Sequence, residues 1–190
     1  PANAYRMAQL PSLADQDLLG ASAKHLDALL HTVVDAEAPV HVDVIARRVM
    51  AAYDLSRAGS RIAACLDQGI ARAVAAHGWQ LKHGFICLPE HAAQPLTLPV
   101  RDRGALPAAE RKLEWVSPQE LQAALHQAVA LAFSLPQGEV ASTAAQLLGF
   151  GRATARMQAA FEPQLQALLD AGVLMAQQDG TLVLSPRPAA

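Results

Sequence analysis

Three arginines and a glutamine recur in one stretch of the chain at a spacing that suits contact with an anion. One side of a helix, away from its apolar stripe, would carry Arg57, Arg61, Gln68 and Arg72 at ~100° per residue. Guanidinium groups pair with phosphates and can donate two hydrogen bonds to a guanine edge. The stretch therefore predicts a nucleic-acid-binding helix, and the alternative is a solvated face whose arginines pair with acids such as Asp54 or Asp67.

Further basic side chains extend this candidate surface. The net charge of −2 does not by itself indicate a nucleic-acid binder, but residues 40–112 hold ten basic and six acidic side chains. The flanking stretches, residues 1–39 and 113–190, are each acidic by three charges. The predicted nucleic-acid contacts outside the first arginine stretch are Lys82, Arg101, Arg103, Arg152 and Arg156.

Catalytic and metal-binding patterns are missing from the sequence. The chain has no CxxC, HxxxH or HExxH spacing and no GxxxxGK[ST] loop. We expect His31 and His126 to pack at the edge of a core, His41 to cap a helix or serve a turn, and Cys65 and Cys87 to be buried thiols. We therefore expect no enzyme activity, no cofactor, no metal and no small-molecule substrate in this stretch of chain.

Two parts of the sequence look like copies of one pattern. LDALLHTVV (26–34) aligns with LQAALHQAV (121–129), and RAGSRI (57–62) aligns with RATARM (152–157), both at an offset of ninety-five residues. The alternative is chance similarity in a chain rich in alanine and leucine. A duplication predicts a lead-in over 1–20, one unit over 21–89, a linker over 90–116, a second unit over 117–185 and a tail over 186–190.

Each copy predicts three helices followed by a β-hairpin. The periodicity of the first copy indicates helices over 22–38, 42–53 and 57–76, then a hairpin over 79–88 that turns at His83-Gly84. The second copy repeats the order over 117–133, 140–148, 152–171 and 173–184. Ser117 and Glu120 fit a capping box, residues 112–116 can add a strand, and Pro163 should kink or split the last helix. The order predicts a mainly α fold, a tandem winged helix-turn-helix.

Several blocks of the sequence resemble a known bacterial family. They are DAEAPVHVDVIARRVMAAYDLSRAGSRI (35–62), LPVRDRG (98–104), RKLEWVSPQEL (111–121) and LLGFGRATARM (147–157). They resemble the uncharacterised domain that closes very large superfamily-one helicase-like proteins, after the helicase core and a Vsr-type endonuclease-like domain. The resemblance spans 5–184. It implies a module attached to a nucleic-acid motor, with those domains as partners, and it carries over no catalytic residue.

Two hypotheses of function follow. The first is a non-catalytic accessory domain that binds duplex or forked DNA through winged helices. The second is a docking or oligomerisation module of the same large protein. No apolar run is long enough to cross a membrane and the N-terminal residues lack the layout of a secretion signal, so we expect a cytoplasmic protein.

Overall fold

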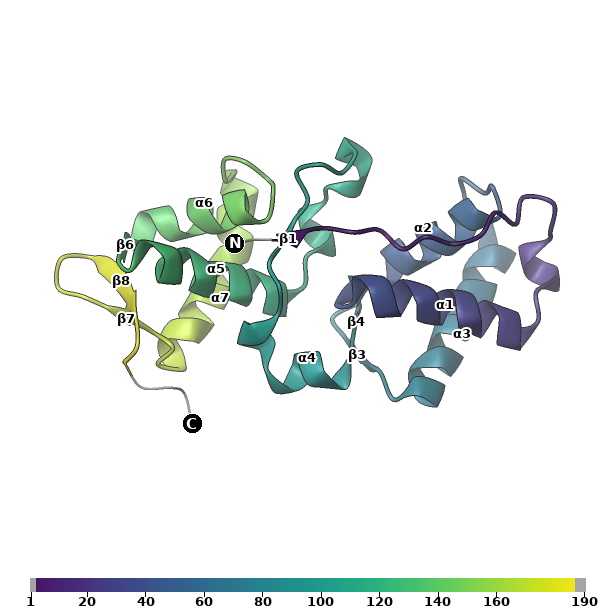
Figure 1. The fold of residues 1–190 in the computed structure, drawn as a ribbon, viewed down its shortest axis with the longest axis horizontal. Helices are drawn as coiled ribbons and strands as arrows, with labels where there is room; N and C mark the ends of the chain where they lie inside the picture. Colours follow the sequence, from purple (N-terminus) through teal and green to yellow (C-terminus); the bar gives the residue numbers. More distant parts are fainter. Residues whose placement is uncertain (1–2, 187–190) are drawn as a thin grey trace. The chain divides into compact units, whose positions relative to one another are not determined.

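The structure, a computed structural model, describes residues 3–186 of the chain. These residues form two compact units, which are mostly helical with small sheets (Figure 1). The first unit is residues 6–93, and the second unit is residues 3–5 together with 94–186. The prediction of a mainly α chain with small β elements is confirmed. Of the predicted tail, 187–190 lie outside the described residues.

The first unit is a three-helix bundle completed by a three-stranded sheet. Its elements are η1 (Leu18–Gly20), α1 (Ala23–Glu37), β2 (Val40–His41), α2 (Val42–Ala52), α3 (Ser60–His77), β3 (Gln80–Lys82), β4 (Phe85–Cys87) and α4 (Pro89–Ala93). The hydroxyl of Ser22 accepts the N–H of His25 and starts α1. Gly78, at φ 66°, ends α3 in the left-handed conformation that glycine adopts without strain. The antiparallel strand order is β2-β4-β3.

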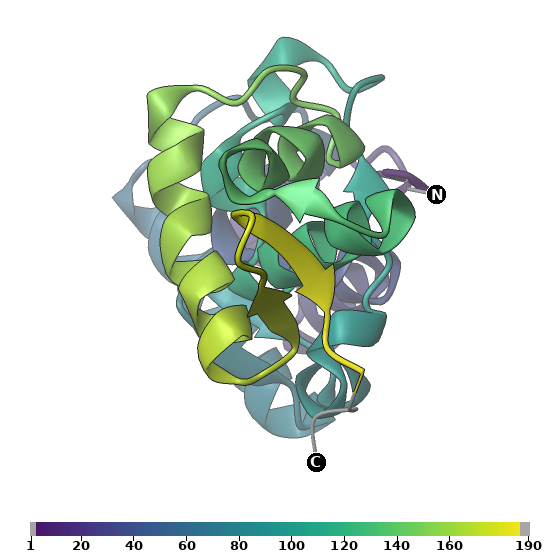
Figure 2. The ribbon, with the colours of Figure 1, turned by 90° about the vertical axis from the view of Figure 1, so that its left-hand side faces the viewer.

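The second unit has the same succession of helices and strands, preceded by a segment of short turns. That segment contains η2 (Pro95–Thr97), β5 (Arg101–Asp102), η3 (Ala108–Glu110) and η4 (Leu113–Trp115), and β5 pairs in parallel with β1 (Asn3–Ala4). The bundle and sheet are α5 (Pro118–Ala132), β6 (Leu135–Pro136), α6 (Gln137–Leu147), α7 (Ala155–Asp170), β7 (Leu174–Ala176) and β8 (Thr181–Leu184). Figure 2 shows the hairpin of β7 and β8 beside α7.

The equivalent long helices of the two units, and the short strands β2 and β6, start ninety-five residues apart. This offset separates the first residues of α1 and α5, of β2 and β6, of α2 and α6, and of α3 and α7. The sheet of the second unit has the order β6-β8-β7, which matches β2-β4-β3. Three apolar positions of α1 and their counterparts in α5 are all buried: Leu26, Leu30 and Val34 with Leu121, Leu125 and Val129.

Several local predictions need correction. The third helices begin at Ser60 and Ala155 rather than at Arg57 and Arg152, because Gly59 and Thr154 hold extended backbone at the N-cap. Residues 113–115 form a 3₁₀ turn and not a strand, since the N–H of Val116 donates to the carbonyl of Leu113. α7 continues through Pro163 without being split. The two-residue strands β2 and β6 were absent from the sequence prediction, because two residues show no period.

Candidate nucleic-acid interface

The outer face of α3 presents basic and polar side chains. Arg61, Gln68 and Arg72 are exposed, whereas the opposite side of the helix buries Leu66, Gly69, Ile70 and Ala73. Gly69 allows α3 to approach α1 closely, since an added Cβ would lie 2.7 Å from Cδ2 of Leu26. The helix is therefore fixed by its apolar side, and Arg61 and Arg72 are separated by ~16 Å along the helix axis.

Two further cations of the first unit are exposed outside the helix. Arg57 lies in the loop three residues before α3, so it can contribute to a surface with α3 but is not part of its helical face. Lys82 ends β3, next to the turn at His83 and Gly84, whose φ angles of 52° and 79° suit a two-residue hairpin. The predicted turn at His83-Gly84 is confirmed.

The exposed cations of the first unit are not held by acids. Within residues 3–186, no ion pair forms at Arg57, Arg61, Arg72 or Lys82. Asp54 and Asp67, the acids that could have paired with them, are exposed and also lack an ion pair within that range. These four side chains are thus available to an anionic ligand, and binding one would break no existing ion pair.

Arg101 and Arg103 lie in a buried cluster and not on a surface. They are 9% and 2% exposed, and both bind the carboxylate of Glu120 through two guanidinium bonds each, with the shortest at 2.7 Å. Their guanidinium carbons lie 4.8 and 4.7 Å from the centre of the Tyr5 ring. A guanidinium enclosed in this way cannot reach a phosphate, so the candidate surface excludes Arg101 and Arg103.

Glu120 is ionised because of this cluster. Burial would raise the pKa of the Glu120 carboxyl, but the charges and hydrogen bonds of the two arginines lower the pKa to about 2. The predicted capping box is only half formed: the hydroxyl of Ser117 accepts the N–H of Glu120, while the carboxylate binds the arginines instead of turning back to Ser117. The spacing identified the cap correctly, but it could not show a partner that lies seventeen residues earlier in the chain.

In the second unit, Arg152 and Arg156 are exposed, and they differ in their neighbours. Arg152 lies in the loop before α7, as Arg57 does before α3. Arg156 belongs to the first turn of α7 and lies 3.7 Å from the Glu114 carboxylate, with both side chains largely exposed. Along α7, the positions equivalent to Gln68 and Arg72 hold Pro163 and Ala167, so the basic face of α3 is not repeated.

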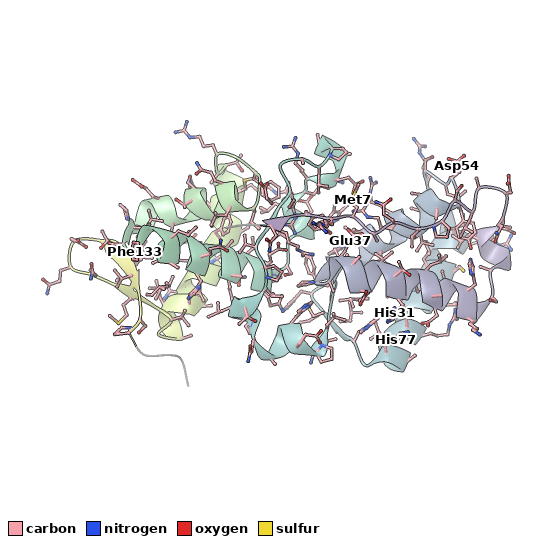
Figure 3. All side chains as sticks on the ribbon, viewed as in Figure 1. Met7, His31, Glu37, Asp54, His77 and Phe133 are labelled. Atoms are coloured by element: carbon pink, nitrogen blue, oxygen red, sulfur yellow. The ribbon has the colours of Figure 1, made fainter. Side chains whose placement is uncertain are left out.

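The histidines take packing and capping roles. Nδ1 of His41 accepts the N–H of Asp43 at the start of α2, which confirms the predicted capping role. His31 and His77 lie side by side, with ring centres 4.9 Å apart, and His77 stacks on Trp79 while Nε2 lies 3.0 Å from the Asp27 carboxylate (Figure 3). Burial lowers the pKa of His126. Across the described part of the chain, no three metal-ligating side chains gather at one place.

Sequence reasoning missed two groups of charged residues. Glu37 is fully buried at the end of α1, where it accepts bonds from the Nε of Arg48 at 2.8 Å and from the N–H of Ala8. Arg111 and Lys112 are exposed beside the start of α7. For the first group no sequence signal existed, because the partners meet through the fold. The adjacent cations of the second were visible in the sequence and were not included in the predicted surface.

Comparison with known protein families identifies a match to part of the chain. Residues 16–64 match the model of a family described as "Protein of unknown function (DUF3320)". The matched part contains α1 and α2 and reaches the first turn of α3. No curated protein and no solved structure is significantly similar to the chain. None of the helices within 3–186 is both long enough and apolar enough to cross a membrane.

Proposed function

We propose that this chain is a non-catalytic, cytoplasmic accessory module that binds duplex or forked DNA through the exposed arginines of its first unit. The observation that carries the proposal is the outer face of α3, where Arg61 and Arg72 are exposed and form no ion pair with any residue from 3 to 186, and Arg57 precedes the helix. Contacts of this kind neutralise phosphates and supply most of the sequence-independent affinity for DNA.

The order of elements supports a winged helix-turn-helix in each unit. Helix, strand, helix, helix and hairpin follow one another, with the short first strand paired to the last strand of the hairpin. In such a domain the third helix enters the major groove and the hairpin lies beside it. Here α3 would be the recognition helix and Lys82 would be a contact from the wing. The common offset of ninety-five residues supports an origin of the two units by duplication.

The resemblance to the terminal domain of helicase-like proteins gives this proposal a context. A motor that moves along nucleic acid needs modules that hold the duplex or the fork near its catalytic core. The proposed partners are therefore DNA and the helicase and nuclease-like domains of a parent chain. The matched family of unknown function is compatible with such a role and does not specify it.

A docking or oligomerisation module is the second candidate, and a specific observation favours it. Phe133 is 85% exposed just after α5, and Leu131 of the same helix end is 54% exposed (Figure 3). Large apolar side chains that are exposed in the free protein can be covered by a partner protein. A partner protein could cover them without using the arginines of α3, so the two candidates predict different sensitive residues.

A salt-dependent titration with labelled duplex, forked and single-stranded DNA tests the proposal. The double variant Arg61→Ala/Arg72→Ala should bind duplex on the order of tenfold more weakly, with a log–log salt slope lower by about two, because each arginine neutralises about one phosphate. Its melting temperature should stay nearly unchanged, because both side chains are exposed. The matched control is Arg6→Ala/Lys24→Ala, which removes two exposed charges of the same unit from segments other than α3.

The control separates a local surface from general charge. Equal weakening by the two double variants would overturn the assignment to α3. Failure of the unaltered chain to bind any DNA at low salt would overturn DNA binding altogether and favour docking. Phe133→Ser should then disrupt association with a second copy or with a parent domain.

A further inference from the structure

A pocket in the second unit brings cationic and apolar side chains together. It has a volume of about 320 Å³ and is lined by residues 111–114, by Phe150, and by Thr154, Arg156 and Met157 at the start of α7. Small-molecule pockets commonly range over ~300–1,000 Å³, so this one suits a ligand of about the size of a single nucleotide. The residues come from three separate segments of the unit, which the fold holds side by side.

The charges around the pocket favour an anion. Arg111, Lys112 and Arg156 line it, against a single carboxylate from Glu114. Glu114 is 3.7 Å from Arg156, with side-chain exposures of 51% and 78%, so this pair is loose and open to competition. Nζ of Lys112 lies 4.5 Å from the centre of the Trp115 ring, a contact that restrains the Lys112 side chain.

The start of α7 adds donors to these cations. Thr154 caps the helix by accepting the N–H of Met157. The amides of Ala155 and Arg156, in the first turn of this sixteen-residue helix, need no partner inside it and add positive potential at its N-terminus. A phosphate held by Arg111 and Arg156 would meet these amides as well. The helix end supports the three side chains here and is not the site on its own.

The remaining wall of the pocket is apolar. Leu113, Phe150 and Met157 line it and pack against the core of the second unit, so each is partly exposed and held in place. A free inorganic anion would leave this wall unused. An anion attached to a flat, weakly polar ring would use both parts, because a base can stack on the Phe150 ring while its phosphate meets the cations.

We propose that this pocket holds one unpaired nucleotide of a DNA single strand. The inference rests on the proposed function and deepens it, since it assigns the single-stranded arm of a fork to the second unit and the duplex to α3. An unpaired nucleotide is required, because bases inside a duplex are stacked and cannot present a ring face to Phe150. Since α7 does not repeat the basic face of α3, the two units are expected to bind different parts of a fork.

Anisotropy titrations with an oligothymidylate, a blunt duplex and free thymidine monophosphate test the inference. Arg111→Ala/Lys112→Ala should weaken binding of the oligothymidylate about tenfold or more and leave duplex affinity within about twofold. Phe150→Leu keeps an apolar packing residue, and it should weaken the same substrate several-fold by removing the stacking ring. The matched control is Arg6→Ala/Lys24→Ala, which removes two exposed charges that do not line the pocket.

Each other outcome counts against the pocket. Equal loss of duplex and single-strand binding in Arg111→Ala/Lys112→Ala would overturn it while leaving the proposed function in place. An equal loss of oligothymidylate binding in Arg6→Ala/Lys24→Ala would overturn it as well. If thymidine monophosphate binds as tightly as the oligothymidylate, the ligand of the pocket is a free nucleotide and not a DNA strand. If the unaltered chain binds no DNA of any form, the proposed function fails and this inference fails with it.

Discussion

The two units of the chain place the same kinds of elements at matching positions but use their charged residues differently. In the first unit, Arg61 and Arg72 are exposed on the outer face of α3 and make no ion pair within the described residues. In the second unit, Arg101 and Arg103 are buried against Glu120. Arginines that look alike in the sequence thus serve a surface in one unit and a core in the other.

The apolar pattern is shared and the polar pattern is not. Leu66 of α3 and Phe161 of α7 occupy equivalent buried positions, and so do Ala73 and Leu168. Glu120 is the third residue of α5. The equivalent residue of α1 is His25, which is not an acid and so cannot bind two arginines as Glu120 does. The bundle therefore forms without the Glu120 cluster, whose particular role is to fix β5 against α5.

Removing the Glu120 carboxylate should have the largest effect. Glu120→Gln removes the charged carboxylate that two buried guanidinium groups bind, which should destabilise the second unit by about 3–5 kcal/mol. The matched variant, Glu114→Gln, breaks an exposed pair and should change stability by less than ~1 kcal/mol. Urea unfolding can follow the units separately, because Trp79 lies in the first and Trp115 in the second and the chain has 2 tryptophans. Equal effects of the two variants would show that the cluster adds nothing beyond a surface pair.

The same cluster predicts a loss of stability in acid. The pKa of Glu120 is about 2 in the folded chain, below its ordinary value near 4.5, so the unfolded chain binds the proton more readily. The contribution is therefore complete above pH ~4.5 and falls as the pH drops toward 2. Unfolding measured by Trp115 fluorescence should show this dependence, and the Glu120→Gln variant should show a smaller one. A flat profile between pH 5 and pH 2 in the unaltered chain would contradict the ionised cluster.

In both units, the residue two positions after the second helix has a positive φ angle. Asp54 and Gly149 are equivalent, with φ angles of 56° and 82°. Asp54 is exposed, whereas a Cβ on Gly149 would collide with the N–H of Gly104 and lie 2.6 Å from the backbone nitrogen of Arg103. Gly149→Ala should destabilise the second unit by about 2–4 kcal/mol, from the strained φ and the clash together.

The matched variant is Asp54→Ala, at a position that already has a side chain at positive φ and is exposed. Its unfolding free energy should therefore change by less than ~1 kcal/mol. Thermal or urea unfolding of both variants gives the difference. If the two losses are equal, backbone conformation alone determines the cost, and the close approach of residues 103–104 to Gly149 is unimportant.

The features that the sequence predicted correctly are those formed by residues close together in the chain. The helices α1, α2 and α5 and the hairpin at His83-Gly84 follow from periodicity, caps and turn residues, which act within a few positions. The burial of Arg101 and Arg103 could not be predicted, since it depends on Glu120 seventeen or more residues away and on Tyr5. The exposed face of α3 was predicted because its apolar stripe fixes its orientation. Its start was misplaced at Arg57, where alanine and arginine gave no sign that the helix begins only after Gly59.

Replacing Pro163 with the residue type found at the equivalent position of the first unit should have the smallest effect on stability. Pro163 lies inside α7, where it removes a backbone donor, and its equivalent in α3 is Gln68, which is exposed like Pro163 itself. Pro163→Gln should restore the missing helical bond and stabilise the second unit by about 1–3 kcal/mol, and Gln68→Ala, the control, should stay within ~0.5 kcal/mol. Trp115 fluorescence during urea unfolding measures the gain. If Pro163→Gln gives no gain, the surroundings of α7 already compensate for the missing donor, and proline at this position would be part of how the second unit differs from the first.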